Sequence, residues 1–340
     1  MVEPVLITGA AGFIGSHVVQ LLLSEGNDVR ATVRNLKNAQ FLESFTQNER
    51  SSLEIVQMDL LESESVRAAV EGCKTVIHCA ASLMVDVKDP QRDVVDPSVT
   101  GTLNLCEAIR LNESIHTIIH TSSVAAIRRT EYENGQTFTS KDWCDDATLK
   151  SNPYGLAKAE AEQKMRAFVD ECHHSERKIR LVTVHPSIVF GPVFHKRHTR
   201  GSMAYLKHYT GKLPFVLNAH LNFVDVRDVA QAHVHAIQYG ENGGRYIVHK
   251  TGLWMNELGA KLRDVLPERK WPVTRLPTVF AILMAAFHPK LTVQQIRSST
   301  GRHVNYDIQN TEEMLKMKLR NIDETLEDSM ESLEELSRKV

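Results

Sequence analysis

Short runs of β-branched and aliphatic residues alternate with amphipathic segments through residues 1–185 of this chain. This alternation is typical of a parallel sheet whose crossover helices cover both faces. Crossovers in such sheets are right-handed, so ligands are expected in a crevice above the carboxyl ends of the strands. The runs expected to be strands are Val5–Thr8, Val29–Val33, Leu53–Met58, Thr75–Cys79, Thr117–His120 and Leu181–Val184.

The pattern changes after Pro186, where glycine, proline, histidine and aromatic residues become more frequent and later segments have mostly helical patterning. At 340 residues the chain is long enough for one such domain with an added lobe. We therefore expect an α/β fold, a Rossmann-type doubly wound parallel sheet with a smaller, mostly helical C-terminal substrate lobe. The predicted Rossmann domain spans 1–185, and 220–250 returns to it. The predicted substrate lobe comprises 186–219 and 251–340.

Composition and charge argue against several classes of protein. The 42 acidic and 40 basic side chains leave a net charge of −2, so no strong field attracts nucleic acid or an anionic membrane. The longest apolar stretch, Val279–Phe287, is shorter than the roughly 20 residues that span a bilayer, and we expect a buried helix or a pocket wall there. The N-terminus has no secretory pattern, and the five cysteines form no Cys-x-x-Cys pair. These features predict a cytoplasmic protein without a metal site.

A glycine-rich turn follows the first predicted strand and opens the first predicted helix. It reads Thr8-Gly9-Ala10-Ala11-Gly12-Phe13-Ile14-Gly15. In this context Gly9 permits a tight turn, Gly12 lets a pyrophosphate approach the backbone, and Gly15 lets the helix lie close to the sheet. The start of the helix, at Phe13 and Ile14, then offers N–H groups to phosphate oxygens. Strand, spacing and position together predict a dinucleotide site.

Residues at the ends of the next strands indicate which dinucleotide binds. An acidic group after the second strand would bind a free 2′-hydroxyl, whereas a guanidinium can pair with a 2′-phosphate. Arg34 stands there with Lys37 close behind, which predicts NADPH or NADP rather than NADH; a solvated surface arginine is the alternative. Asp59, followed by Leu60, could accept from adenine or cap a helix. Small residues after the fourth strand would let the cofactor pass: Cys79, Ala80 and Ala81.

A phenol and an ammonium lie four residues apart at the start of a predicted helix that continues to about Val169. Tyr154 and Lys158 would share one face of that helix. A phenol with a pKa of about 10 is a poor acid or base at neutral pH. Positive charge from Lys158 or an oxidised nicotinamide could lower that pKa. Together with Thr121-Ser122-Ser123 after the fifth strand, the pair indicates a catalytic site rather than ordinary surface residues.

With these segments the chain resembles an extended short-chain dehydrogenase/reductase of the NAD-dependent epimerase/dehydratase superfamily, in the dihydroflavonol-4-reductase-like group. The resemblance implies that Tyr154 exchanges the proton, Lys158 holds the nicotinamide ribose and Ser123 hydrogen-bonds the substrate oxygen. It also implies that Thr121, Pro186 and Ile188 border the cofactor. The matching stretches span nearly the whole chain: Thr8–Ser16, Val76–Ala81, Asp96–Asn104, Thr121–Ser123, Tyr154–Lys158, His185–Pro192 and Phe223–Ala230.

The sequence differs from those of the related reductases at two places, and these differences narrow the class of substrate that we expect. Flavonoid reductases carry Asn or Asp five residues after the serine, where this chain has Arg128. Cinnamoyl-CoA reductases usually carry Asn-Trp-Tyr-Cys-Tyr where this chain has Asn152–Leu156. A plant phenolic substrate is therefore not supported, and an apolar pocket would favour a hydrophobic ketone or aldehyde. Two alternatives stay open for these apolar residues, a pocket lining or, for several of them, the hydrophobic core: Leu83, Met84, Phe190, Tyr205, Leu213 and Phe215.

Three functions remain open. The first is an NADPH-dependent carbonyl reductase, or an alcohol dehydrogenase in the reverse direction. The second is a 3β-hydroxysteroid dehydrogenase/isomerase or a nucleotide-sugar epimerase/dehydratase on the same scaffold. The third is a non-catalytic NADP-sensing protein, which the presence of Tyr154 and Lys158 disfavours. The expected partner is a small molecule, with no nucleic acid and no membrane; helices beginning near Ser98 and Asn152 could also pair in a homodimer.

Overall fold

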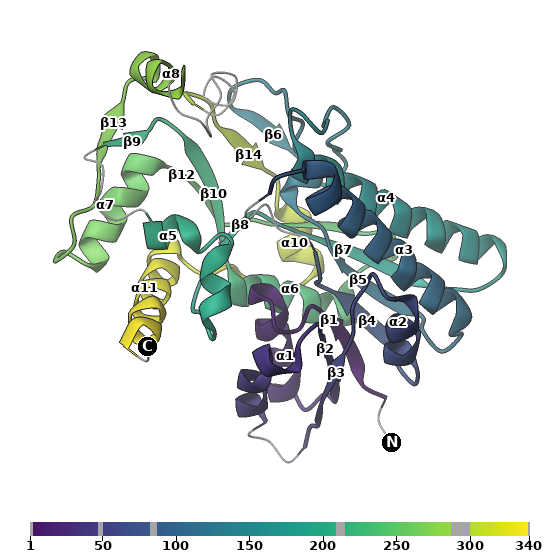
Figure 1. Ribbon diagram of the computed structural model, residues 1–340. Coiled ribbons are helices and arrows are strands. Elements are labelled where there is room, and N and C mark those ends of the chain that lie inside the picture. Colours follow the sequence, from purple (N-terminus) through teal and green to yellow (C-terminus); the bar gives the residue numbers. More distant parts are fainter. Residues whose placement is uncertain (1–2, 47–49, 82–86, 209–214, 287–299, 339–340) are drawn as a thin grey trace.

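The computed structural model describes residues 3–46, 50–81, 87–208, 215–286 and 300–338. Its central sheet has seven parallel strands in the order β11-β7-β5-β4-β1-β2-β3 (Figure 1). The doubly wound sheet expected from the sequence is confirmed, and the strand order reverses between β1 and β4, above which ligands bind in such folds. The strands are β1 (Val5–Thr8), β2 (Val29–Val33), β3 (Leu53–Gln57), β4 (Thr75–His78), β5 (Thr117–Thr121), β7 (Arg180–Pro186) and β11 (Arg245–Val248).

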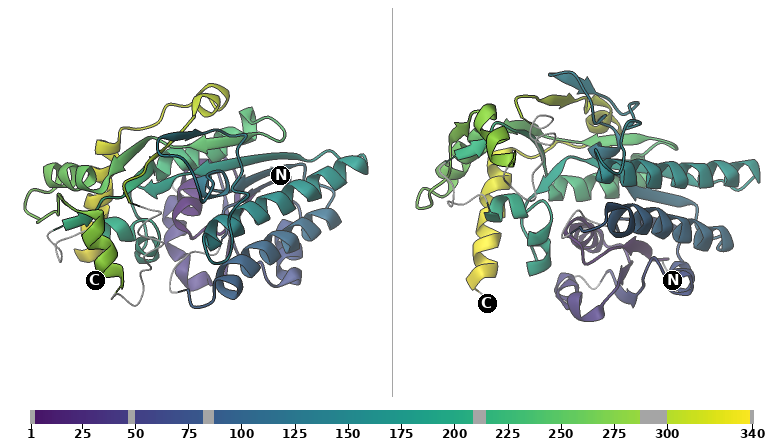
Figure 2. Two further views of the ribbon diagram at one scale, coloured as in Figure 1. Left: turned by 90° about the horizontal axis from the view of Figure 1, so that it is seen from above. Right: turned by 45° about the horizontal axis from the view of Figure 1, so that its top comes forward.

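Helices cover both faces of this sheet because successive strand residues point to opposite sides. Leu6 packs in one apolar layer with residues of α2, α3 and α4, whereas Ile7 packs in another with residues of α1 and α6. Figure 2 shows the helices around the sheet from two further directions. The helices are α1 (Phe13–Ser24), α2 (Ser63–Val70), α3 (Asp96–Leu111), α4 (Pro153–His174) and α6 (Val226–Tyr239).

A second lobe is built around a three-stranded sheet in the order β12-β10-β8. These strands are β8 (Ile188–Phe190), β10 (His220–Asp225) and β12 (Thr251–Trp254), and the helices α7 (Met255–Val265) and α11 (Ile322–Arg338) share an apolar core with them. Of the two strands expected within 220–250, β11 therefore lies in the large sheet and β10 in the small one.

Shorter elements complete the lobe and connect it to the large domain. Two parallel pairs are formed by β9 with β13 and by β6 with β14. The elements are β6 (Gln136–Phe138), α5 (Ala204–His208), β9 (Phe215–Leu217), β13 (Thr274–Leu276), α8 (Thr278–Ala286), β14 (Val304–Tyr306) and α10 (Gln309–Met314). The lobe thus holds short strands beside its helices.

The apolar run that starts at Val279 forms α8, but the expectation of a buried helix is wrong for its outer face. Val279, Phe280 and Leu283 are 76%, 58% and 57% exposed. The helix packs on the narrow β9–β13 pair, which covers only one side of it. Phe287 lies outside the described residues. Among the helices that the structure describes, none is long and apolar enough to cross a membrane.

Candidate active site

The glycine turn lies between β1 and α1, and two of its positions have no room for a side chain. Gly9 has a φ of +66°, in the left-handed region that favours glycine. A Cβ on Gly9 would lie 2.8 Å from the Cα of Ala80, and a Cβ on Gly15 would overlap the carbonyl oxygen of Gly9. The turn, the end of β4 and the start of α1 are therefore packed backbone against backbone.

The start of α1 fits the phosphates of a dinucleotide. Gly12 is its N-cap, is exposed, and makes no side-chain capping hydrogen bond. First-turn amides such as those of Phe13 and Ile14 have no partner within a helix. The positive end of the helix dipole and these free N–H groups favour an anion at this point.

Arg34 and Lys37 both lie on the surface directly after β2. The structure holds the backbone of this segment: Gln57 Nε2 donates to the Arg34 carbonyl at 3.3 Å, and Asn35 Oδ1 accepts from the Lys37 N–H at 3.0 Å. The cationic ends of both side chains are accessible to solvent. They can therefore reach a phosphate placed beside the end of β2.

Asp59 and Leu60 follow β3, where the adenine was expected. Asp59 Oδ1 accepts from the Leu61 N–H at 3.0 Å, so this carboxylate stabilises a turn rather than a helix N-terminus. The Leu60 side chain lies where Gly101 of α3 leaves space. The Leu60 carbonyl accepts from Asn104 Nδ2 at 2.7 Å, so Asn104 is engaged in fixing this turn.

Cys79 lies at the end of β4 beside the end of β5. Its Sγ accepts from Thr121 Oγ1 at 3.4 Å, and burial raises the pKa of this thiol to about 11. Cys79 is therefore a neutral thiol at physiological pH. Ala80 and Ala81 follow it, and Ala80 N–H donates to Thr8 Oγ1 at 3.2 Å.

The start of α4 is fixed by Asn152. Its Oδ1 accepts from the Gly155 N–H at 3.0 Å, and its Nδ2 donates to Thr130 Oγ1 at 3.3 Å. Pro153 takes the first helical position, where its missing N–H costs nothing. This cap places Tyr154 in the first turn of the helix.

We expect Asn152→Ala to lower the free energy of unfolding by about 1 kcal/mol, the usual loss for an N-cap side chain. Asn152→Asp is the matched control, because it keeps an oxygen to accept from the Gly155 N–H and should lose less stability. Urea unfolding followed by circular dichroism measures both variants. An alanine variant as stable as the unmodified protein would contradict the capping role.

Ser123, Tyr154 and Lys158 come together at the carboxyl end of β5. The Ser123 side chain lies close enough to the Tyr154 phenol to lower the pKa of that phenol. Lys158 Nζ donates to the Thr121 carbonyl at 3.0 Å, and the Lys158 side chain is only 7% exposed. Ser123 Oγ also donates to the Pro186 carbonyl, at 3.5 Å, which brings the end of β7 to the same place.

The protonation of this group differs from the sequence-based expectation. Burial raises the pKa of Tyr154, and the nearby Ser123 side chain offsets part of that rise. Burial also lowers the pKa of Lys158 to about 8, although Cys79 and Glu162 both oppose that fall. The expected lowering of the Tyr154 pKa by Lys158 is not found among the described residues, because the ammonium is directed at the Thr121 carbonyl.

Sequence reasoning missed a buried carboxylate beneath this group. Glu162 is fully buried one turn beyond Lys158. It accepts from Ser122 Oγ at 2.7 Å, from His185 Nε2 at 2.8 Å and from Arg245 Nε at 2.8 Å. The signal that could have identified it is the spacing of Tyr154, Lys158 and Glu162 at intervals of four, which places all three on one helix face.

Of the apolar residues proposed from the sequence to line a pocket, the three that the structure describes do not form one cluster. Phe190 is fully buried and stacks on Phe223 with ring centroids 4.6 Å apart, so it belongs to the core of the lobe. Tyr205 is 46% exposed, and Phe215 is half-buried. The other candidates, Leu83, Met84 and Leu213, lie outside the described residues.

Histidines near the glycine turn bind backbone carbonyls. His198 Nε2 donates to the Ala11 carbonyl at 3.2 Å, and His17 Nε2 donates to the Pro192 carbonyl at 2.9 Å. These bonds attach the segment after β8 to the start of α1. Within the ranges that the structure describes, no group of three His, Cys, Asp or Glu side chains could hold a metal ion.

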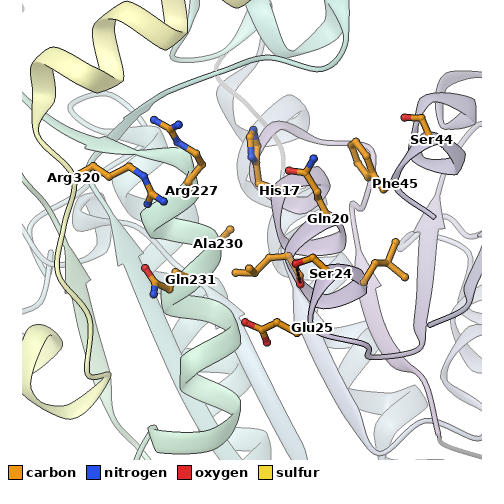
Figure 3. A pocket seen from close by; sticks show the side chains of 12 residues that line it. His17, Gln20, Ser24, Glu25, Ser44, Phe45, Arg227, Ala230, Gln231 and Arg320 are labelled. Carbon is orange, nitrogen blue, oxygen red and sulfur yellow. Dashed lines mark hydrogen bonds between the residues drawn. The ribbon is translucent and has the colours of Figure 1, made fainter. Parts of the chain in front are cut away.

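A groove of about 620 Å³ lies between α1 and α6 (Figure 3). Gln20 and Ser24 line it from α1, and Gln231 lines it from α6. Arg227 and Arg320 also line it, but each is ion-paired, to Asp225 and Asp228 respectively. This groove contains none of the residues assigned to the dinucleotide or the catalytic group, so it is separate from the crevice above the strand ends.

Known proteins resemble this chain over most of its length. The model of the NAD dependent epimerase/dehydratase family matches residues 5–248. Cinnamoyl-CoA reductase CAD2 of Medicago truncatula is 31% identical over 79% of this chain and 82% of the relative. The maize (Zea mays) dihydroflavonol 4-reductase is 28% identical over 79% of this chain and 76% of the relative. Yeast methylglyoxal/isovaleraldehyde reductase Gre2, solved with NADPH, superposes with a TM-score of 0.80 at 27% identity, covering 99% of this chain and 100% of Gre2.

Proposed function

Because this chain belongs to the NAD-dependent epimerase/dehydratase family and is an NAD(P)-dependent reductase, we propose that it uses NADPH to reduce a hydrophobic ketone or aldehyde, or oxidises the alcohol in reverse. The observation that carries this proposal is the cluster of Ser123, Tyr154 and Lys158 at the carboxyl end of β5. We propose these three as the catalytic residues and the glycine turn as the phosphate site.

Each residue of the cluster has a separate task in the proposed reduction. Bound NADPH supplies the hydride that the carbonyl carbon accepts. Ser123 and Tyr154 hold the carbonyl oxygen by hydrogen bonds and stabilise the negative charge that develops on it. The raised pKa keeps the Tyr154 phenol protonated, so it can donate its proton to that oxygen. Lys158 binds the nicotinamide ribose, and its charge adds to the positive potential of the site.

The preference for NADPH is supported by the accessible cations after β2. Arg34 and Lys37 are both exposed where the 2′-phosphate of NADPH would lie. Arg34→Ser should raise the dissociation constant of NADPH about tenfold, the effect of one hydrogen bond to a charged group, and leave that of NADH nearly unchanged. Titration of reduced nicotinamide fluorescence gives both constants.

Arg302→Ser is the matched control for this titration, because Arg302 is an exposed arginine outside both proposed sites. It should leave the dissociation constants of NADPH and NADH unchanged. Equal affinity of the unmodified protein for the two dinucleotides would contradict the assignment of Arg34 to the 2′-phosphate.

The substrate class is tested by following nicotinamide absorbance while NADPH is incubated with aldehydes, diketones, sterols and nucleotide sugars. Oxidation of NADPH with an apolar aldehyde or ketone is the expected result. Activity confined to sterols or nucleotide sugars would replace this proposal with the alternative chemistries of the same scaffold. Binding of NADPH without turnover of any carbonyl would contradict carbonyl reduction.

The proposal also covers the cellular environment of the protein and its binding partners. All five cysteines are free thiols, which supports a reducing, cytoplasmic environment. We propose a small-molecule substrate as the ligand, with no nucleic-acid or membrane partner. A homodimer through α3 and α4 is also proposed, and the exposed Leu103 and Leu111 on α3 are consistent with it.

A further inference from the structure

Three consecutive residues at the end of β5 each contact a different residue on one face of α4. Thr121 accepts from Lys158 through its carbonyl at 3.0 Å, and the Ser123 side chain lies beside the Tyr154 phenol and lowers its pKa. Between them, Ser122 Oγ donates to Glu162 at 2.7 Å. Two of these contacts involve the proposed catalytic residues, and the third has no task in the reduction described above.

The third contact leads to a buried carboxylate that connects several elements. Glu162 is fully buried, and its Oε2 also accepts from His185 Nε2 at 2.8 Å. Its Oε1 accepts from Arg245 Nε at 2.8 Å and from Arg166 Nε at 3.1 Å. One carboxylate therefore joins α4 to β5, β7 and β11. A buried charge with this many donors is costly to disturb, because each donor would lose its partner away from water.

Two of the residues that bind Glu162, one on β7 and one after β5, each come directly before a residue of the proposed site. His185 precedes Pro186, whose carbonyl accepts from Ser123 Oγ at 3.5 Å. Ser122 precedes Ser123 itself. The backbone of both strand ends is thus fixed one residue before it reaches the crevice, and the anchor is the same carboxylate.

The Arg245 branch extends the network to the start of α4. The Arg245 guanidinium lies 3.8 Å from the Trp143 ring centroid and donates to the Ser140 carbonyl at 2.8 Å. Cys144, next in the chain after Trp143, accepts from Asn152 Nδ2 through its Sγ at 3.7 Å. Asn152 is the N-cap that sets the position of Tyr154.

We infer that Glu162 is a positioning residue for carbonyl reduction: it fixes the ends of β5 and β7 through Ser122 and His185, and so sets the geometry of Ser123, Tyr154 and Lys158 without touching substrate or cofactor. This inference rests on the proposed function. Misplacement of catalytic groups by about 1 Å can cost a hundredfold in rate, so such an anchor has a measurable effect on turnover.

The negative charge of Glu162 also raises the pKa of Lys158, and this effect is separate from the positioning of the strand ends. Burial alone would raise its pKa, but His185, Arg245 and Arg166 hold it well below the usual range, so Glu162 is an anion. Burial lowers the pKa of Lys158 to about 8, and Cys79 and Glu162 oppose that fall.

The other titratable groups that face Lys158 are neutral at physiological pH. Cys79 is a thiol with a pKa of about 11. Burial lowers the pKa of His78 to about 3, that of His233 to about 4, and that of His120 well below its usual value. Among the groups that the structure describes around this lysine, Glu162 is therefore the anion that raises the pKa of Lys158. Loss of its charge lowers the pKa of Lys158 further, so the lysine gives up its proton at a lower pH.

The test compares Glu162→Gln and Ser122→Ala with the unmodified protein. Glu162→Gln keeps the shape and removes the charge, whereas Ser122→Ala removes one contact and keeps the charge. We expect Glu162→Gln to lower kcat at least about tenfold while the dissociation constant of NADPH stays nearly constant. The alkaline limb of its pH–kcat profile should move to lower pH. Ser122→Ala should lower kcat less and leave that limb in place.

Asp228→Asn is the matched control, because Asp228 is also a fully buried carboxylate paired with an arginine, Arg320, on the α6 side of the molecule. It should reduce stability without changing kcat or the pH profile. An equal loss of kcat in this control, or a folded Glu162→Gln protein with unchanged kcat and pH profile, would overturn the inference. If Glu162→Gln does not fold, Ser122→Ala becomes the deciding variant. An unchanged kcat in Ser122→Ala then overturns the inference.

Amide hydrogen exchange tests the anchoring role of Glu162 independently of whether the protein reduces a carbonyl compound. Amides 121–126 should exchange faster in both test variants than in the unmodified protein, and Asp228→Asn should leave them unchanged. If the unmodified protein reduces no carbonyl compound, the proposed function fails, while faster exchange still supports the anchoring role. Unchanged exchange in both variants overturns that role whatever the activity.

Discussion

Tyr154→Phe is expected to lower kcat for carbonyl reduction at least about a hundredfold, the lower end of the usual contribution of a general acid. The substitution removes the phenolic proton and one hydrogen bond to the carbonyl oxygen, and it leaves the ring in place. Because the hydroxyl is not needed for phosphate binding, the dissociation constant of NADPH should change by less than about threefold. Steady-state kinetics with an accepted carbonyl compound and fluorescence titration of NADPH measure the two effects.

Tyr239→Phe is the matched control for this loss, because it removes a half-buried hydroxyl on α6 away from the crevice. It should retain full turnover. A Tyr154→Phe protein with most of its activity would remove the phenol from the mechanism, and the acid would then have to be another group at the end of β5.

The fold was predictable because buried parallel strands are nearly continuous apolar runs. Val5–Thr8 is such a run, the other strands of the large sheet contain β-branched and aliphatic residues, and the family resemblance read from the same segments is confirmed. An apolar run predicts a strand, but it does not indicate which other strand that strand pairs with. His220–Asp225 has strand patterning like Arg245–Val248, yet it pairs with β8 and β12 in the lobe.

The candidate site was predictable where residues lie next to a strand end or share a helix face. Ser123 lies two residues beyond the end of β5, and Tyr154 and Lys158 are one turn apart on α4, so local spacing places each of them near a strand end or on a shared helix face. Glu162 was missed because charged residues are ordinarily exposed. Its partners, Arg245 and His185, are 83 and 23 positions away in the chain, a separation at which no local pattern indicates contact.

The wrong expectations share one physical origin, which is that apolar side chains suit several environments equally well. Phe190 is a candidate for a substrate pocket or for the core, and its ring stacks in the lobe core. The run from Val279 is expected to be a buried helix or a pocket wall, but only one side of α8 packs against a neighbouring surface. An apolar composition favours burial of a segment, but the number of helices and strands that pack around the segment decides whether it is buried.

Gly15→Val is expected to weaken NADPH binding by about a hundredfold, which corresponds to about 3 kcal/mol, the upper end of the usual cost of overpacking. Any Cβ at this position overlaps the carbonyl oxygen of Gly9, and a backbone atom cannot move aside as a flexible side chain can. The start of α1 must shift away from the turn, and its first N–H groups then no longer point at the phosphates. Titration of NADPH fluorescence measures the change.

Ser16→Ala is the control for this substitution, because it lies on the same turn of α1 and removes only a hydroxyl that donates to the Phe13 carbonyl at 3.1 Å. Its dissociation constant for NADPH should stay within about threefold of the unmodified value, since the net contribution of one such hydrogen bond is small. Circular dichroism of both variants shows whether the sheet remains folded. A folded Gly15→Val protein with undiminished affinity would mean that the dinucleotide phosphates bind elsewhere than at the start of α1, and the assignment of the whole crevice would then have to change.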